Sequence, residues 1–241
     1  MSSLIPVMIL VLAQAQEGKY EAALKKFGDR SFLLLVNGEK AGTLTLKTRI
    51  EREGGRSVAV FEDRFVMAIK GEESILTVTE KASTDRLRLI SAKRTTKEGG
   101  KEVDWILSVE GKKASLQSGG RKETIDITEG TIGEQAVVRL VCAADQKEGV
   151  TFTADVLSGV EDQLQRGHSF RCLGKEQVEI GGKKFDAFKW ENKGEWKTIR
   201  KVGDEDVPGS TSVDNTFWVS PDGYLLRYAG AGGAEMILDA K

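Results

Sequence analysis

Hydrophobic residues occupy every second position through most of the chain after Arg30. The segments 44–50, 58–69 and 103–109 show this alternation most clearly, with apolar residues on one face and mainly polar residues on the other. A strand with this pattern buries one face and exposes the other, which is typical of an antiparallel sheet. The sequence therefore predicts a mainly β fold built on a large antiparallel sheet.

Short glycine turns separate the alternating segments. Glycine, and Asn or Asp before glycine, supplies the positive φ that tight hairpins require. The turn pairs are Asn37-Gly38, Gly54-Gly55, Gly99-Gly100, Gly119-Gly120, Gly181-Gly182 and Asp222-Gly223. Their spacing predicts a meander of strands, and no parallel βαβ unit is expected because no long helical pattern lies between the strands.

In two segments the apolar residues recur at helical spacing instead. From Glu17 to Gly28 the apolar residues fall on one face, and the closing glycine can cap a helix. A second helix is predicted from Gly133 to Ala144, although the β-branched residues within 137–141 leave a strand as the alternative. The expected fold class is thus a β-rich α+β protein in which one or two short helices cover the sheet.

Predicted strands fill both residues 30–128 and residues 150–240, and no Pro/Ser-rich linker separates the two halves. Domain boundaries usually fall in exposed linkers of that composition. One continuous sheet is therefore favoured over two domains, and residues 16–241 are predicted to form a single β-rich domain.

The N-terminal segment resembles a secretory signal peptide. An apolar run from Leu4 to Leu12 is followed by Ala13-Gln14-Ala15, which matches a small-residue cleavage site. The run is shorter than the roughly 20 residues that a membrane-spanning helix needs. Residues 1–15 are predicted to be removed, which gives a periplasmic or secreted protein. The segment carries no Lys or Arg before its apolar run, and a buried N-terminal strand or helix is the alternative.

Charge balance argues against nucleic acid as a partner. The 241 residues contain 36 Lys and Arg against 37 Asp and Glu, a net charge of -1. Nucleic-acid binding needs a basic surface that neutralises phosphates, and no basic cluster here is free of neighbouring acids. No second hydrophobic stretch is long enough to span a membrane, so no membrane span is predicted.

The 2 cysteines, Cys142 and Cys172, have two interpretations. In an oxidising compartment they could form a disulfide that closes the loop between them, which would stabilise the fold by about 3–4 kcal/mol. Two buried free thiols are the alternative, because pairing cannot be read from sequence. Neither a metal nor a redox Cys-x-x-Cys motif is present.

Catalytic chemistry has few candidate residues. The single histidine, His168, is not accompanied by a Gly-x-Ser-x-Gly motif, and one histidine cannot build a multi-histidine zinc site. The segment Asp204-Glu205-Asp206 does not have EF-hand spacing and is interpreted as a solvated turn. No catalytic residue, metal site or cofactor is predicted.

Aromatic residues gather in the last quarter of the chain. Phe188 and Trp190 lie on one face of a predicted strand, and Phe185 and Ala187 lie on the other. Such clusters pack across strands, or they line a concave apolar surface that accepts a ligand. The residues predicted to bind an apolar ligand are Phe65, Met67, Trp105, Leu107, Phe188, Trp190 and Trp218.

The run from Asn215 to Tyr228 contains a Phe-Trp pair and then a Pro-Asp-Gly turn between two strands. It resembles the ending of uncharacterised periplasmic β-rich proteins whose architecture is similar to the lipoprotein carriers LolA and LolB. The segment Val36–Gly42 is similar to the opening hairpin of those proteins. The resemblance spans most of residues 30–240. It implies a strongly curved half-barrel around one or two helices, with a hydrophobic concavity that holds acyl chains in the carriers.

No residue known to govern lipid transfer in the carriers can be matched to this sequence. No cysteine follows the apolar N-terminal run, so the resemblance does not extend to an anchored receptor of the LolB type. The favoured function is a non-enzymatic exported protein that binds a lipid or another apolar small molecule. The alternatives are a hydrolase with a dispersed site around His168 and Asp204–Asp206, and an envelope scaffold that binds a protein partner.

Overall fold

The computed structural model describes residues 20–69, 72–158, 163–202 and 205–240. The predicted signal peptide, residues 1–15, lies outside this range. Within it, fifteen strands form one sheet, and residues 20–27 and α2 are helical. The elements are β1 Arg30–Val36, β2 Glu39–Glu53, β3 Arg56–Ile69, β4 Glu72–Ser83, β5 Leu89–Glu98, β6 Lys101–Glu110, β7 Lys113–Ser118, β8 Arg121–Asp126, β9 Thr131–Gly133, α2 Glu134–Ala143, β10 Thr151–Ser158, β11 Gln163–Ile180, β12 Lys183–Val202, β13 Glu205–Val219, β14 Leu225–Ala229, η1 Ala231–Gly233 and β15 Ala234–Leu238.

The sheet consists of two meanders joined through β1. Its order is β8-β7-β6-β5-β4-β3-β2-β1-β15-β14-β13-β12-β11-β10-β9, so β1 pairs with β2 on one side and with β15 on the other. β8 and β9 stand at the two ends of this order, so the sheet does not close into a barrel. This open, strongly curved, mostly antiparallel sheet confirms the predicted fold class.

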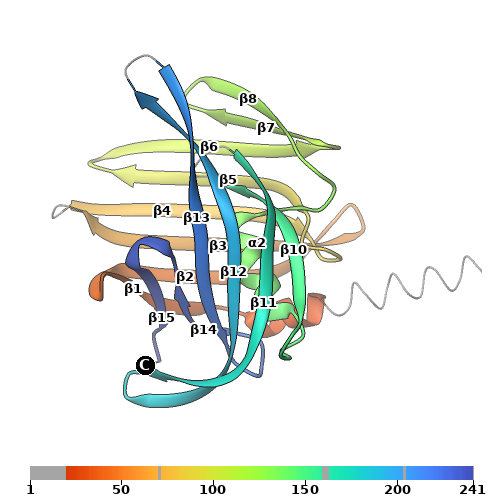
Figure 1. Ribbon diagram of the computed structural model, residues 1–241. Coiled ribbons are helices and arrows are strands. Elements are labelled where there is room, and N and C mark those ends of the chain that lie inside the picture. The colour runs from red at the N-terminus through yellow and green to blue at the C-terminus, as the bar shows by residue number, and fades with distance from the viewer. Residues whose placement is uncertain (1–19, 70–71, 159–162, 203–204, 241) are drawn as a thin grey trace, which may run out of the picture.

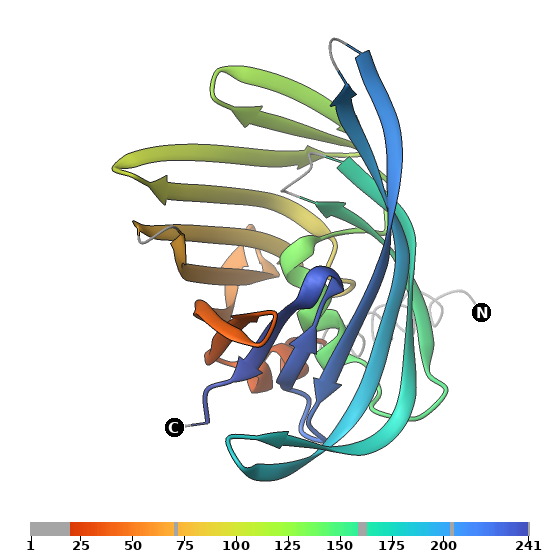
Figure 2. The same ribbon diagram turned by 60° about the vertical axis from the view of Figure 1, so that its left-hand side comes forward.

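The two meanders face each other across α2. In Figure 1 the strands β10–β13 cross in front of β3–β6, and α2 lies between the two layers. The turned view in Figure 2 shows α2 enclosed between the yellow and orange strands of the first meander and the cyan and blue strands of the second. The helix predicted for residues 17–28 is confirmed over residues 20–27, and residues 17–19 lie outside the described range. The second predicted helix is confirmed as α2, so the strand alternative for residues 133–144 is wrong. The helical residues 20–27 place Leu24 and Phe27 in the main core.

One topological expectation is wrong. β9 and β10 are parallel, with Asp155, Val156 and Leu157 opposite Thr131, Ile132 and Gly133, and α2 connects the two strands. The connection is a short βαβ unit, which the hydrophobic pattern does not reveal because β9 is only 3 residues long. It brings α2 directly onto the inner face of the sheet.

The alternation along the strands is confirmed where the strands cross the core. Leu44 and Leu46 on β2 are buried, as are Trp105 and Leu107 on β6. Val103 has the same parity as Trp105 but is 53% exposed, because this end of β6 extends beyond the core.

Two buried acidic side chains attach α2 to the first meander. Glu80 on β4 accepts hydrogen bonds from the backbone nitrogens of Gln135 and Ala136, each at 3.1 Å, and so caps the helix N-terminus. Gly133 is required there, since a Cβ on it would lie 2.1 Å from Oε2 of Glu80. Burial raises the pKa of Glu80 to about 8.

The second acidic side chain, Asp63 on β3, forms a bidentate ion pair with Arg139 of α2. Nη1 of Arg139 lies 2.8 Å from Oδ2 and Nη2 lies 2.5 Å from Oδ1, and both side chains are excluded from solvent. The guanidinium also lies over the rings of Phe27 and Phe61, with its Cζ 5.0 Å and 4.9 Å from the two ring centroids. The orientation of α2 inside the sheet is therefore set by specific polar contacts as well as by apolar packing.

Candidate functional site

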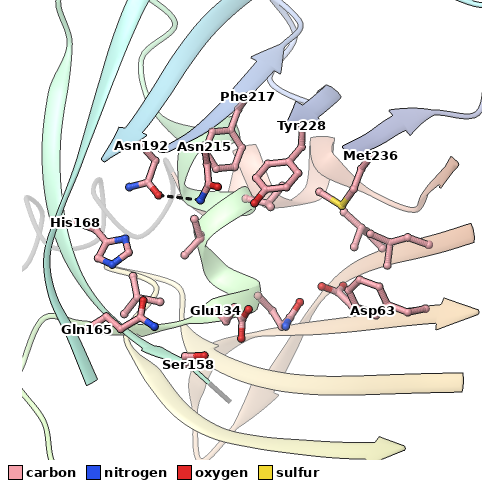
Figure 3. A pocket seen from close by; sticks show the side chains of 17 residues that line it. Asp63, Glu134, Ser158, Gln165, His168, Asn192, Asn215, Phe217, Tyr228 and Met236 are labelled. Atoms are coloured by element: carbon pink, nitrogen blue, oxygen red, sulfur yellow. Dashed lines mark hydrogen bonds between the residues drawn. The ribbon is translucent and has the colours of Figure 1, made fainter. Parts of the chain in front are cut away.

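A cavity lies between α2 and the concave face of the sheet, and we call it the His168 cavity (Figure 3). Its volume is about 230 Å³. Both meanders and α2 contribute to its wall. The lining residues are Leu44, Leu46, Asp63, Phe65, Glu134, Gln135, Val137, Val138, Val156, Ser158, Gln165, His168, Asn192, Asn215, Phe217, Tyr228 and Met236.

A second cavity, of about 310 Å³, lies beside the first, and we call it the Trp105 cavity. It is lined by Phe65, Met67, Leu76, Val78, Glu80, Leu89, Ala92, Arg94, Trp105, Leu107, Gly133, Glu134, Gln135 and Leu157. The two cavities share Phe65, Glu134 and Gln135, so they adjoin at the N-terminal turn of α2. Their volumes are small but near the range of roughly 300–1,000 Å³ that is common for small-molecule sites.

A β-bulge in β11 brings two polar side chains into the His168 cavity. His168 pairs with Ala154 of β10, whereas Gln165 pairs with Val156, so two residues of β11 lie opposite Asp155 alone. Gly167 adopts φ +69° in the bulge, and its backbone nitrogen donates to Oδ1 of Asp155 at 2.9 Å. Residues of odd and even number normally face opposite sides of a strand. The extra residue places Gln165 and His168 on the same side.

Asp155 holds the bulge through both of its oxygens. Besides the contact with Gly167, Oδ2 accepts a hydrogen bond from the hydroxyl of Thr128 at 2.9 Å. The carboxylate is therefore engaged by the backbone and by a neighbouring hydroxyl. It fixes the strand geometry that presents the two side chains to the cavity.

The imidazole of His168 lies against the backbone of β12. A Cβ on Gly194 would lie 2.9 Å from both Cδ2 and Nε2 of the ring, so only glycine leaves room for it. Burial lowers the pKa of His168, while a hydrogen bond with the side chain of Asn192 opposes that shift. The ring is consequently uncharged at neutral pH.

Two buried nitrogens on this wall have no hydrogen-bond partner: Nε2 of Gln165 and Nε2 of His168. The residues are only 4% and 3% exposed. Figure 3 shows both side chains extending into the cavity from β11. Most buried polar groups in folded proteins are paired, and an unpaired one costs about 1–3 kcal/mol. This wall therefore has unused hydrogen-bonding capacity, which water or another molecule can satisfy.

A ladder of amides continues the polar wall across β12 and β13. Nδ2 of Asn215 donates to Oδ1 of Asn192 at 3.2 Å, and Nδ2 of Asn192 donates to the carbonyl oxygen of Ser169 at 3.2 Å. Tyr228 on β14 lines the opposite side, and burial raises the pKa of its phenol to about 12. The phenol stays neutral and can act as a donor or an acceptor.

The structure brings together four of the residues predicted to bind a ligand. Phe65, Met67, Trp105 and Leu107 all line the Trp105 cavity, and Phe65 lines the His168 cavity as well. They come from β3 and β6, which are separated in the sheet by β4 and β5. Their grouping at one cavity keeps them as candidate ligand contacts.

The other three predicted residues lie elsewhere and line neither of these two cavities. Trp190 is fully buried in the main core, and its Nε1 donates to Oε1 of Gln146 at 2.9 Å. Phe188 lies on the same face of β12, under the amino group of Lys175. Trp218, on β13, lies on the opposite face of the sheet from Phe188 and Trp190. The Cζ atom of Arg227 lies 5.0 Å from the centroid of its ring.

Cys142 and Cys172 are both buried free thiols, so the disulfide considered for them is absent from the structure. Burial raises the pKa of both thiols. Among the described residues there is no cluster of three or more His, Cys, Asp or Glu side chains that could hold a metal ion. Of the predicted acidic turn, Asp204 lies outside the described residues, and Glu205 and Asp206 belong to β13.

Among the polar residues around the two cavities, only His168 stood out in the sequence. Asp63, Glu80, Asn192 and Asn215 are polar residues at positions where the alternation of their strands places apolar ones. A polar residue at a core position of a strand is the signal that would have found them. Gln165 gave no such signal, because the bulge reverses its expected face.

The fold defines a β-barrel-like protein with an open, curved sheet. The sequence matches no family model, and no curated protein matches it. A solved structure with similar fold is the β-barrel-like protein of the domain of unknown function DUF1849 from Brucella abortus. It is 11% identical, with 87% of this chain and 94% of that chain covered and a TM-score of 0.53.

A DUF1089 family protein from Pseudomonas aeruginosa aligns at 12% identity over 75% of this chain and 87% of that chain, with a TM-score of 0.36. At such identities only the fold is informative, and it comes from the first of the two proteins. The β-rich, barrel-like architecture is the part of the expected resemblance that the comparison supports. In the described residues, no helix combines the length and the apolar character needed to cross a membrane.

Proposed function

We propose that this protein is an exported, non-enzymatic binding protein that holds a lipid or another apolar small molecule between α2 and its curved sheet. The observation that carries the proposal is the pair of adjoining cavities, one lined mainly by apolar side chains around Trp105 and the other ending in unpartnered polar atoms. A molecule with an apolar chain and a polar end matches this arrangement.

Support for the proposal comes from the motifs at Val36–Gly42 and Asn215–Tyr228, which resemble those of β-rich proteins similar in architecture to the LolA and LolB carriers, whose concavity holds acyl chains. The two cavities are small, so they suit a short apolar chain or part of a longer one. Burial of apolar surface, at roughly 25 cal/mol per Å², would provide most of the affinity. The polar end would fix the orientation of the ligand.

A binding role suits His168 better than the hydrolytic alternative. Asp155, the carboxylate whose charge acts on the ring, is already bound by Gly167 and Thr128. A general base is normally oriented by a third group that stabilises its charged form. The environment of His168 instead favours the neutral ring.

Titration with an apolar fluorescent dye, N-phenylnaphthylamine, tests the proposal. Ala92 lines the Trp105 cavity between Glu80 and Leu107, so Ala92→Phe should fill that cavity and weaken dye binding at least tenfold. Ala68 is exposed on β3, and Ala68→Phe is the matched control that should bind as the unmodified protein does. Equal dye binding by the two variants, or no binding by the unmodified protein, contradicts the proposal.

A further inference from the structure

We infer that the His168 cavity is a head-group site selective for an uncharged, hydrogen-bonding polar group, such as the glycerol ester of a monoacylglycerol. The inference rests on the proposed function and specifies which amphiphile it concerns. The apolar chain of the ligand would extend past Phe65 into the Trp105 cavity, because that side chain lines both spaces.

The hydrogen-bonding groups on the cavity wall define what the head group must offer. Nε2 of Gln165 belongs to a carboxamide, whose nitrogen only donates, so the ligand must offer an acceptor oxygen. Nε2 of the neutral His168 ring either donates or accepts. An ester carbonyl beside a hydroxyl supplies both kinds of partner. Both nitrogens are buried and face the same cavity, so one head group can satisfy both of them.

The charges around the His168 cavity favour an uncharged head group. Of the described residues that line the His168 cavity, none is a lysine or an arginine, whereas Asp63 and Glu134 are carboxylates. The nearby guanidinium of Arg139 is bound to Asp63 through two of its nitrogens. A carboxylate or phosphate head would lose its hydration here and gain no cation, which is strongly unfavourable. An uncharged head does not incur this cost.

Among the described residues that line the Trp105 cavity, Arg94 is the one lysine or arginine. An anionic amphiphile could therefore bind in the reverse direction, with its head at Arg94 and its tail toward His168. The selectivity experiment distinguishes the two orientations, because only the proposed one depends on Gln165 and His168.

The variants Gln165→Leu and His168→Leu replace the unpartnered nitrogens with apolar groups of similar size. Because these nitrogens are unsatisfied in the free protein, we expect each variant to be as stable as the unmodified protein or more stable. A residue with a merely structural role would instead destabilise the fold when replaced. Gln177→Leu is the matched control, since Gln177 is exposed on the same strand.

The probes are monodecanoylglycerol, decanoate and decyl phosphate, each measured by displacement of the apolar dye at neutral pH. The unmodified protein should bind monodecanoylglycerol at least tenfold more tightly than either anion. Each of Gln165→Leu and His168→Leu should lower that affinity about tenfold, which corresponds to about 1.4 kcal/mol. Gln177→Leu should leave the affinity unchanged.

The outcomes separate the two claims. If neither the dye nor any amphiphile binds the unmodified protein, the proposed function fails and the head-group assignment fails with it. If the amphiphiles bind but an anion is preferred, or if Gln165→Leu and His168→Leu keep full affinity for monodecanoylglycerol, only the assignment is overturned. A loss of stability in both variants without a loss of affinity also overturns it.

Discussion

Replacing Arg139 by methionine should destabilise the protein more than most single substitutions would. Arg139 is buried on α2 and donates to both oxygens of Asp63, to the carbonyl oxygens of Gln135 and Lys47, and to the hydroxyl of Thr48. The substitution leaves the Asp63 carboxylate buried without its cation. Removing one partner of a buried ion pair typically costs about 3–5 kcal/mol, a large part of a total stability of about 5–15 kcal/mol.

Urea unfolding followed by circular dichroism gives the free energy of unfolding of each variant by linear extrapolation. The double variant Arg139→Met/Asp63→Leu should recover most of the loss, because no buried charge remains unpaired. Thr48→Val is the control, since it removes only the 3.3 Å contact to Nε and should cost about 0.5–1.5 kcal/mol.

The pH dependence gives a further check on Arg139→Met. Burial raises the pKa of Asp63 from its ordinary value of 3.8, and loss of the guanidinium raises it further. At pH values above 3.8, the folded variant then binds more protons than its unfolded chain does. Its loss of stability relative to the unmodified protein should therefore grow as the pH rises. A loss below about 1 kcal/mol, or a double variant no more stable than the single one, would refute this account of how α2 is held.

Three further predictions follow from the cap of α2, the wall of the His168 cavity and the N-terminus. Because folding raises the pKa of Glu80 from 4.5 to about 8, the native state retains a proton that the unfolded chain releases. As the pH rises between those two values, the free energy of unfolding should fall by roughly 1.4 kcal/mol per pH unit, or by at most about 5 kcal/mol in total. Urea unfolding midpoints measured across this pH range should fall less for Glu80→Gln, which has no carboxyl group to titrate. A Cβ at position 194 would displace the His168 ring, so Gly194→Ala should destabilise the fold by about 1–3 kcal/mol and weaken amphiphile binding. Unchanged amphiphile binding by this variant would contradict the described wall of the cavity. Intact mass measurement of the exported protein should show an N-terminus at Gln16, whereas retention of residues 1–15 would contradict the signal peptide.

The fold was largely predictable because the hydrophobic pattern along its strands has a simple period of two residues. An antiparallel strand that buries one face must alternate, so the pattern of 44–50 and 103–109 indicated the sheet directly. The helix α2 was also found from its spacing, despite its β-branched residues. The pattern does not reveal how far a strand extends beyond the core, which is why Val103 has core parity but is exposed.

The site was less predictable because it depends on departures from the pattern. The bulge at Gly167 places Gln165 and His168 on one face, and a strict period of two would have separated them. The aromatic residues of β12 were correctly assigned to faces, since Phe188 and Trp190 lie in the main core and Phe185 packs on the other side, but their parity could not show what covers each face. Trp190 is covered by the core and by Gln146, so its burial does not make it part of a cavity.

An apolar molecule held in the concavity should remain bound when the protein is purified under mild conditions. The test is mass spectrometry of organic extracts from protein purified without detergent out of its native envelope fraction, with Ala92→Phe prepared in parallel. We predict a lipid or another apolar compound in near-stoichiometric amount with the unmodified protein, and a much smaller amount with Ala92→Phe. Repeated preparations of unmodified protein free of any such compound would contradict the central claim.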